Sequence, residues 1–380
     1  MMQTDTLEHL DTPALVLDRG RMDANIARMR ERAAALGVKL RPHLKTCKSV
    51  DVALRMAAAG DPVTVSTLRE AEYFAEAGFT DIFYAVAIAP QKLDRVAALQ
   101  QGRARILLAV DSFEAARAVR LAAERLGVRF QVMIEIDSGD GRSGIAADTV
   151  QLPDIAGALG DGVELAGVFT HGGHSYAGRS AGEHAAVAGQ ERAAVTSAAA
   201  RLREAGHACP IVSLGSTPSV VHARSLDGVT EVRAGVYVFF DLFQAGIGSC
   251  EREDIALGVL TTVIGNHPER GQLVVDAGAL ALSKDVSTRA LGDGGDCGYG
   301  LVADAMTGCV LEGLYVHGVS QEHGIICSRG GAMEHAGFHI GRRLLILPNH
   351  ACLTAAAYDR YHVVDGGNAI EAVWPRVNGW

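Results

Sequence analysis

The chain has 380 residues, of which 48% are hydrophobic and 21% are charged, an ordinary composition for a globular protein. This length suits one large domain plus a smaller one. The formal net charge of -9 and the lack of a basic tract make nucleic acid and anionic membranes poor candidate partners.

The cysteines and the N-terminus predict a cytoplasmic protein. The seven cysteines are scattered, odd in number and without Cys-x-x-Cys spacing, which argues against a disulfide framework and favours a reducing compartment. Residues 1–10 are polar and acidic, with neither the basic start nor the apolar core of a signal peptide. No run approaches the ~20 apolar residues that are needed to span a bilayer.

In chain order, the first expected element is a strand over residues 13–18. A helix over 19–36 follows, with Met22, Ile26 and Met29 at helical spacing and a glycine to end it. Apolar strands and amphipathic helices then alternate. The expected strands are 38–43, 62–67, 81–86, 104–110, 129–137, 164–171, 210–217 and 231–240. The helices between them include 50–59, 68–77, 91–99, 113–126 and a long helix within 182–205.

This alternation predicts an α/β fold, a (β/α)8 barrel, because about eight strand-then-helix units fit into the region. A doubly wound open sheet remains the structural alternative, since alternation alone cannot prove that the sheet closes. We expect the barrel to occupy residues 19–243.

A change in the pattern of hydrophobic residues from about Leu257 predicts an all-β C-terminal domain. Short β-like runs alternate there with turns rich in glycine and aspartate, and long helical periodicity is missing. The domain is expected to span 244–380 and to include the N-terminal strand within residues 1–18. The expected runs are 259–264, 273–275, 313–317, 344–347 and 362–364.

The first barrel strand leads into a lysine-containing stretch, residues 41–48. A lysine at the mouth of a strand can be a Schiff-base nucleophile or a general base when its surroundings lower its pKa. Lys45 is the candidate for this role, whereas Lys48 is interpreted as a supporting charge or a solvated side chain. The alternative is that both are ordinary surface lysines in a loop.

Polar residues and glycines gather at the ends of the other expected strands, where barrel enzymes carry their catalytic groups. Gly215, Ser216 and Thr217 form a strand-to-helix turn before a proline, which suits an anion at backbone N–H groups. Gly235 and Val236 on the next strand add to this predicted phosphate site. Plain N-capping by Ser216 or Thr217 is the alternative.

A lysine on the first strand, a phosphate site on the last two strands and His171 between them together suggest pyridoxal phosphate. His171 is flanked by two small glycines, so its imidazole could stack on the cofactor ring. The alternative is a hydrogen-bonded core histidine.

The C-terminal domain holds a second candidate cluster, the pair His350 and Cys352. Imidazole nitrogen and thiolate sulfur are ligands that zinc favours. A buried cysteine and a capping histidine are the alternative, since two ligands in one short motif form a weak signal.

Taken together, these motifs resemble the fold-type III pyridoxal phosphate enzymes that act on D-hydroxy amino acids. The group holds D-serine dehydratases, D-threo-3-hydroxyaspartate dehydratases and D-threonine aldolases, and the chain is most similar to the second class. The motifs that carry the resemblance are Arg41-Pro42-His43-x-Lys45, Glu135-x-Asp137-x-Gly139-x-x-Arg142-x-Gly144, His171-Gly172-Gly173-His174-Ser175-Tyr176, Gly215-Ser216-Thr217-Pro218, Arg233-Ala234-Gly235-x-Tyr237 and Asn349-His350-x-Cys352.

The resemblance implies an alanine-racemase-like barrel, a β domain, a homodimer and a divalent metal near the cofactor, zinc or else manganese, magnesium or cobalt. It implies that Lys45 forms the Schiff base, Arg142 lies near the phenolic oxygen and His171 stacks on the ring. Tyr176 would approach the pyridine nitrogen, and Tyr237 would lie beside the phosphate residues. The phosphate contacts would come from Gly215, Ser216, Thr217, Gly235 and Val236, and the metal ligands would be His350 and Cys352.

The expected reaction is elimination of water from a small D-3-hydroxy amino acid, of the D-threo-3-hydroxyaspartate or D-serine type. The released enamine is then hydrolysed to a 2-keto acid and ammonia. Within the resemblance, dehydratases show His-x-Cys at the metal pair and D-threonine aldolases tend to show His-x-Asp, so Cys352 favours elimination. Aldol cleavage to glycine and an aldehyde remains the main alternative. A racemase and a non-catalytic pyridoxal phosphate carrier are further alternatives.

Overall fold

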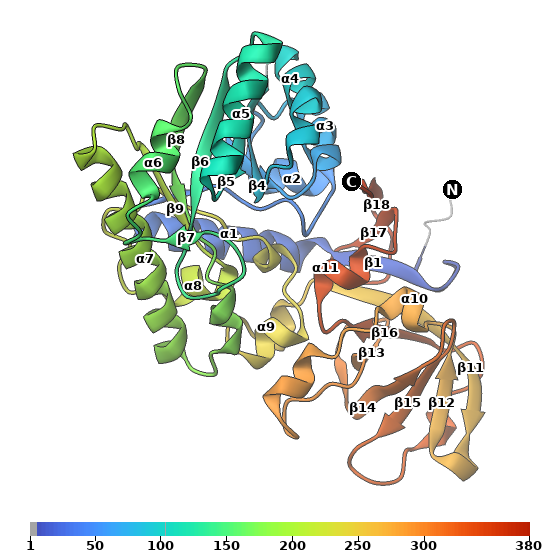
Figure 1. The fold of residues 1–380 in the computed structure, drawn as a ribbon. Helices are drawn as coiled ribbons and strands as arrows, with labels where there is room; N and C mark the ends of the chain where they lie inside the picture. The colour runs from blue at the N-terminus through green and yellow to red at the C-terminus, as the bar shows by residue number, and fades with distance from the viewer. Residues whose placement is uncertain (1–5, 103) are drawn as a thin grey trace. The chain divides into compact units, whose positions relative to one another are not determined.

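The computed structural model describes residues 6–102 and 104–380, and the chain falls into two compact units (Figure 1). One unit holds Ala27–Gly235 with Val377–Trp380, and the other holds the residues up to Ile26 with Val236–Arg376. The interval 1–10, in which no signal peptide was expected, lies partly outside the described residues. Within the described residues, no helix combines the length and the apolar character that crossing a membrane requires.

The first unit is built on a parallel sheet that closes on itself. Its strands neighbour one another in the order β2-β10-β9-β8-β6-β5-β4-β3, and the short β7 pairs beside β6. The strands are β2 (Lys39–Leu40), β3 (Pro62–Val65), β4 (Asp81–Ala87), β5 (Arg105–Val110), β6 (Phe130–Asp137), β7 (Ile145–Ala146), β8 (Val163–Phe169), β9 (Ile211–Leu214) and β10 (Glu231–Val232).

Closure occurs just beyond β2. This strand pairs in parallel with β10, and His43 then forms a parallel bridge with Thr64 of β3. The N–H of Thr64 donates to the Pro42 carbonyl at 2.9 Å, and the N–H of Leu44 donates to the Thr64 carbonyl at 2.8 Å. The first strand therefore contacts both the last strand and the second. The barrel prediction is confirmed, and the open doubly wound sheet is excluded.

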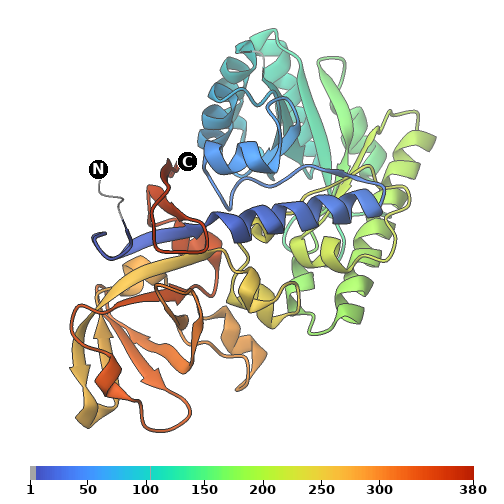
Figure 2. The ribbon, with the colours of Figure 1, turned by 180° about the vertical axis from the view of Figure 1, so that it is seen from behind.

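Helices surround the barrel strands on the outside, as the views from both sides show (Figures 1 and 2). They are α1 (Arg19–Ala35), which crosses the boundary between the units, α2 (Val50–Met56), α3 (Leu68–Glu76), α4 (Leu93–Gln101), α5 (Phe113–Leu126), α6 (Leu152–Gly157), α7 (Ala181–Glu204) and α8 (Thr217–His222). The hydroxyls of Ser112 and Ser180 accept backbone N–H bonds at the starts of α5 and α7. Such caps satisfy N–H groups that have no partner within the helix.

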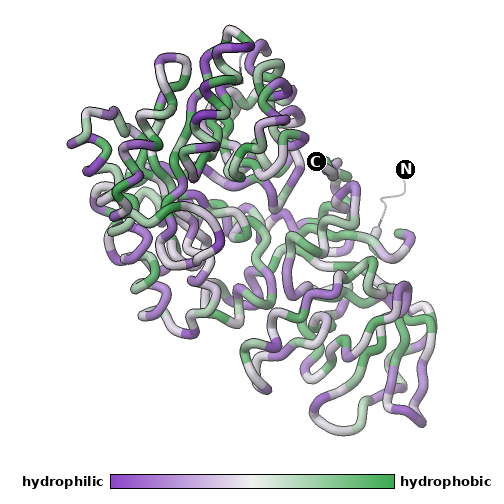
Figure 3. Tube along the Cα trace, in the orientation of Figure 1, coloured by the Kyte–Doolittle hydropathy of each residue, from purple (hydrophilic) through white to green (hydrophobic). Residues whose placement is uncertain are grey.

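A buried apolar cluster is formed by side chains from the four neighbouring strands β4, β5, β6 and β8. Phe83 and Phe169 meet edge to face at 4.9 Å between ring centroids, and they pack with buried residues from β5, β6 and β8. The strands β5 and β6 are almost entirely buried apolar runs, as expected for a parallel sheet covered on both faces, and hydrophobic segments recur within this unit in Figure 3.

The second unit is a largely antiparallel sheet in the order β12-β15-β14-β13-β16-β11-β1-β17-β18. The N-terminal strand β1 pairs antiparallel with β11 and parallel with β17. The strands are β1 (Ala14–Asp18), β11 (Leu257–His267), β12 (Gln272–Val275), β13 (Leu301–Asp304), β14 (Val310–Val319), β15 (Gly324–Ser328), β16 (Arg343–Leu347), β17 (Arg360–Val364) and β18 (Ala372–Pro375). The short helices α9 (Leu242–Gly246), α10 (Ala279–Leu282) and α11 (Ala351–Ala355) belong to the same unit.

Candidate functional site

Lys45 lies in a tight turn directly after β2, at the C-terminal end of the barrel strands. Its neighbours Leu44, Thr46 and Cys47 are fully buried, whereas the Lys45 side chain is exposed. The N–H of Lys48 donates to the Leu44 carbonyl at 2.9 Å and closes the turn. Because the turn is anchored on both sides of it, Lys45 projects from a rigid support.

Lys48 braces this turn rather than lying free in solvent. Its Nζ is 3.1 Å from Oε1 of Glu70, whose side chain is only 1% exposed. The other carboxylate oxygen of Glu70 accepts the N–H of Ser66, in the loop after β3. Of the two interpretations made from the sequence, the supporting charge is therefore the correct one.

Two neutral imidazoles lie near Lys45. Burial, together with the positive charges of Lys45 and Arg142, lowers the pKa of His171 to about 3. Burial and the charges of Lys45 and Arg233 lower the pKa of His43 well below its ordinary value. Both rings are therefore uncharged at neutral pH, whereas Lys45, Arg142 and Arg233 bring positive charge close to them.

The orientation of His171 follows from its hydrogen bond. Its Nδ1 lies 3.2 Å from the carbonyl oxygen of Gly215, so the neutral ring donates its Nδ1–H to that carbonyl. Nε2 then carries the lone pair. This bond ties the loop after β8 to the loop after β9.

Arg142 and Tyr176 come from two further rim loops. Arg142 follows β6, its side chain is 59% exposed, and its nearest carboxylates, Glu135 and Asp140, are each 3.9 Å away. These loose contacts leave its guanidinium able to bind a ligand. The ring of Tyr176 has its centroid 6.4 Å from that of His171, so the two rings flank one side of the rim.

The predicted phosphate residues fit an anion in one specific respect. Thr217 is only 1% exposed, and its buried Oγ1 has no hydrogen-bond partner. A buried hydroxyl without a partner is costly, so an unfilled donor here suits a ligand oxygen. Ser216, in contrast, is already engaged: its hydroxyl caps α8 through the N–H of Ser219.

The two rim glycines permit close backbone approach at the same place. Gly215 has φ +124°, which a residue with a side chain rarely adopts. A Cβ atom on Gly235 would come within 2.9 Å of the His43 carbonyl oxygen. The backbones that would cradle a phosphate thus pass directly beside the Lys45 loop, and the residues present fit pyridoxal phosphate.

The structure brings together Lys45, Arg142, His171, Tyr176, Gly215, Ser216, Thr217 and Gly235 on one barrel rim. Val236 and Tyr237 follow directly in the chain but belong to the second unit, where Tyr237 is completely buried. Its expected place beside the phosphate stays a prediction.

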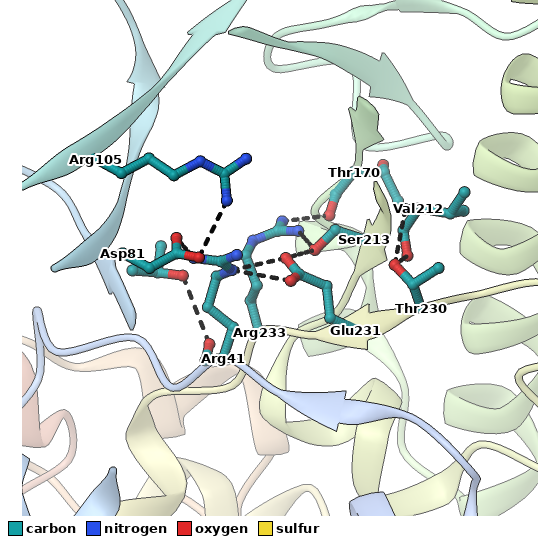
Figure 4. Close-up of polar contacts among 10 residues, drawn as sticks. Arg41, Asp81, Arg105, Thr170, Val212, Ser213, Thr230, Glu231 and Arg233 are labelled. Carbon is teal, nitrogen blue, oxygen red and sulfur yellow. Dashed lines mark hydrogen bonds and ion pairs between the residues drawn. The ribbon is translucent and has the colours of Figure 1, made fainter. Parts of the chain in front are cut away.

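A buried charge network lies inside the barrel (Figure 4). Arg41 Nε donates to Glu231 at 2.9 Å and its Nη1 donates to Asp81 at 2.7 Å. Arg233 donates to the Ser213 hydroxyl at 2.6 Å and to the Thr170 carbonyl at 2.7 Å. Arg233 therefore points into the barrel, and its charge acts on the rim from below.

The candidate metal pair lies at the start of α11 in the second unit. His350 precedes the helix and Cys352 lies in its first turn. Although burial opposes it, hydrogen bonds to Asp285 and Cys352 and the charge of Asp241 raise the pKa of His350 to about 11. The His350 Nδ1 to Asp285 Oδ2 distance is 3.8 Å. The imidazole and the thiol are therefore neighbours in an acidic setting that favours a cation.

The donor set suits a metal with open positions rather than a closed structural site. In the described part of the chain, no three or more His, Cys, Asp or Glu side chains are arranged to hold one ion. The His350 side chain is 41% exposed, so substrate or water could complete the coordination. Asn349 fixes the approach to this pair, since its amide donates to the carbonyls of Asp285 and Gly298 at 2.8 Å each.

Sequence reasoning missed the buried polar residues that support these loops. Glu191 on α7 is fully buried and accepts the Gly172 N–H at 2.7 Å, and Asp241 accepts the Ala351 N–H at 3.0 Å. A signal for Glu191 was present, because it falls on the same helical stripe as the buried residues Ala188 and Val195. Asp241 carries no comparable pattern.

Comparison with known proteins places the chain in a family. Residues 17–242 match the model for the alanine racemase N-terminal domain, and residues 256–364 match that for a putative serine dehydratase domain. D-threo-3-hydroxyaspartate dehydratase of Delftia sp. (strain HT23) is 48% identical over 99% of this chain and 100% of its own length. The chain therefore belongs to the alanine racemase N-terminal domain family, in the branch that includes these dehydratases. D-serine dehydratase of Dictyostelium discoideum is 32% identical, over 96% of each chain.

Solved structures of relatives agree with the fold. D-threo-3-hydroxyaspartate dehydratase from Delftia sp. HT23 superimposes with a TM-score of 0.95, covering 99% of this chain and 100% of that one. Two structures of that enzyme carry a histidine-to-alanine and a cysteine-to-alanine substitution two residues apart, and the latter is in the metal-free form. Alanine racemase of Clostridium difficile, at 13% identity and a TM-score of 0.69 over 96% of this chain and 98% of that one, shares the fold.

Proposed function

We propose that this family member is a pyridoxal phosphate- and metal-dependent lyase that eliminates water from a D-3-hydroxy amino acid. Water then hydrolyses the released enamine, so the net products are a 2-keto acid and ammonia. The observation that carries the proposal is the rim geometry, in which an exposed, anchored Lys45 lies near an uncharged His171 and a buried Thr217 hydroxyl without a partner. The 48% identity to a D-threo-3-hydroxyaspartate dehydratase supports that substrate ahead of D-serine.

The roles of the chain's own residues follow from their places. Lys45 Nζ would bind the cofactor and then take the proton from the substrate α-carbon. His171, held by the Gly215 carbonyl and uncharged, would lie against the cofactor ring without adding positive charge. Arg142, whose side chain is 59% exposed and only loosely paired, would supply a cation to the ligand.

The two expected cofactors would supply what side chains lack. Pyridoxal phosphate, held by Lys45, His171, Gly215, Ser216, Thr217 and Gly235, would provide an electron sink for the charge left on the α-carbon. A divalent ion, held by His350 and Cys352, would provide a Lewis acid for the departing hydroxyl.

Aldol cleavage is the weaker candidate. The D-threonine aldolase of Arthrobacter sp is 31% identical over 97% of this chain and 93% of its own length, well below the dehydratase relative. Cys352 at the second position of the metal pair also favours elimination. We further propose a homodimer in the cytoplasm, the latter supported by the seven cysteines, none of which forms a disulfide in the structure.

The function is tested with the purified enzyme and three substrates: D-threo-3-hydroxyaspartate, D-serine and D-threonine. We expect a 2-keto acid and ammonia from one or both of the first two. Lys45→Ala should lower kcat/KM by about a thousandfold or more and abolish the lysine-linked cofactor absorbance. Lys39→Ala, an exposed lysine on β2, is the matched control and should behave as the native enzyme. Glycine as the main product, or an unchanged spectrum for Lys45→Ala, would refute the proposal.

Metal removal provides the second test. Treatment with a strong chelator followed by dialysis should stop turnover while the cofactor absorbance persists, because the metal ligands and the cofactor lysine are different residues. Added zinc, or another of the expected divalent ions, should restore turnover. Full activity in demonstrably metal-free enzyme would remove the Lewis-acid role from the proposal.

A further inference from the structure

A buried chain of hydroxyl groups joins two rim loops of the barrel. The hydroxyls of Ser175 and Ser216 are 2.8 Å apart, and those of Ser216 and Ser219 are 2.9 Å apart. Ser175 lies in the loop after β8, which also carries His171 and Tyr176. Ser216 lies in the loop after β9, beside Thr217. These serines are each at most 3% exposed, so the chain is shielded from water.

Glu191 holds one of the two loops that this chain joins. It projects from the buried face of α7, and its Oε1 accepts the Gly172 N–H at 2.7 Å. Burial raises its pKa, while the Ser219 hydroxyl, the Gly172 N–H and the positive charge of Arg233 act in the opposite direction. Its other carboxylate oxygen, Oε2, is buried and has no hydrogen-bond partner, so the Gly172 N–H is the direct hydrogen bond between this carboxyl group and the rim.

The backbone at Gly172 packs closely against the Glu191 side chain. A Cβ atom added to Gly172 would come within 2.6 Å of Glu191 Cδ, so the loop backbone rests directly on the carboxyl group. A buried carboxyl group is expensive unless its partners satisfy it. Apolar helix packing alone would be served better by an alanine or a valine, as at Ala188 and Val195.

We propose that Glu191 is a positioning residue that sets the loop of His171 and Tyr176 and the loop of Ser216 and Thr217 in one geometry. It holds the loop after β8 through the Gly172 N–H, and the hydroxyl contact between Ser175 and Ser216 joins that loop to the loop after β9. The positions of His171, which would contact the cofactor ring, and of Thr217, which would contact its phosphate, thereby depend on each other. This inference rests on the proposed function, since it assumes that the rim binds pyridoxal phosphate.

The test measures the affinity of the full-length apoprotein for pyridoxal phosphate by absorbance titration, with thermal unfolding of each apoprotein alongside. Glu191→Ala should weaken binding about tenfold or more, because it leaves the Gly172 N–H without its acceptor. Glu191→Gln keeps that acceptor and should restore the affinity to within about threefold of native. Ser219→Ala removes one hydroxyl group from the serine chain, should preserve the fold and should weaken the binding of pyridoxal phosphate, as Glu191→Ala does.

Val195→Ala, on the same buried face of α7, is the packing control. It should lower the melting temperature and leave the affinity within about twofold, because Val195 has no polar partner to lose. Native affinity in both Glu191→Ala and Ser219→Ala would overturn the proposal. An equal loss of affinity in Glu191→Gln and Glu191→Ala would also overturn it. So would a loss of affinity in Val195→Ala as large as that in Glu191→Ala, if the two variants have the same melting temperature.

These outcomes separate the inference from the proposed function. If the native apoprotein does not bind pyridoxal phosphate, the proposed function fails. If the native apoprotein binds it and produces a keto acid while the Glu191 and Ser219 variants bind equally well, only the positioning role fails.

Discussion

At the scale of single residues, backbone strain lies beside the candidate sites. Among the described residues other than glycine, three have φ in the left-handed region: Lys48 at 48°, Phe240 at 50° and Ser283 at 69°. Each is within three residues of Lys45, Tyr237 or Asp285, respectively. Such conformations cost about 1–3 kcal/mol and persist only where the surroundings enforce them. The strain therefore supports a functional interpretation of these loops.

The pKa of His171 predicts a pH dependence of stability. A histidine with a folded pKa of about 3 and an ordinary value of 6.5 binds more protons when unfolded, between those two pH values. Stability therefore rises with pH across this window and is lost as pH falls below 6.5. We expect His171 to contribute about 1 kcal/mol per pH unit to this loss.

Denaturant unfolding of the apoprotein near neutral pH and at roughly pH 5 measures this effect. His171→Phe should lose less stability than the native protein over the same interval, because its side chain takes up no proton. His43 has a shift in the same direction and remains in the variant, so some acid sensitivity should persist. Identical losses in the two proteins would show that His171 is not held uncharged.

At the scale of elements, sequence patterns located helices better than strand ends. The helix predicted over 113–126 is α5 with the same bounds, because Ser112 caps one end and Gly127 ends the other. The strand expected over 231–240 is only β10, Glu231–Val232. The following apolar residues are buried in a turn instead of pairing in the sheet, and hydrophobicity reports burial rather than pairing.

The cap of α7 gives a prediction at this scale. The Ser180 hydroxyl accepts the Glu183 N–H at 3.3 Å, so Ser180→Ala should lower the free energy of unfolding by about 1 kcal/mol. Ser197→Ala is the matched control, because Ser197 is exposed within the same helix and alanine is the better helix former. It should be neutral or slightly stabilising. Equal losses from the two substitutions in chemical denaturation would contradict the capping role.

At the scale of the whole barrel, closure brings charges together that are far apart in the sequence. Arg41 follows the first strand, Glu231 lies in the last, and Asp81 begins β4 (Figure 4). The Arg41 side chain is 2% exposed and bonds both carboxylates. Removing one member of a buried pair leaves an uncompensated charge in the interior.

Arg41→Met should therefore cost about 3–5 kcal/mol of unfolding free energy. Arg105→Met is the matched control, because Arg105 also contacts Asp81 but is 41% exposed, and such a pair contributes about 1 kcal/mol or less. Circular dichroism during denaturant unfolding measures both. If the two variants lose the same stability, the buried network does not stabilise barrel closure.

The sequence by itself determined the kind of molecule: the strand–helix alternation, the all-β texture after about Leu257, and the short motifs around Lys45, His171 and His350. These are local patterns of periodicity and residue type, which the chain carries without folding. The tertiary structure decided what depends on distant residues. It closed the barrel through the His43 and Thr64 bridge and paired Lys48 with Glu70.

Tertiary structure also turned Arg233 inward and set Glu191 against the Gly172 loop. None of these contacts could be predicted from a local pattern, because each joins residues whose separation in the sequence carries no signal of their proximity. Burial also changed the pKa values of the rim histidines. The low pKa of His171 arises from desolvation and from charges on three different strands' loops, which meet only when the sheet closes.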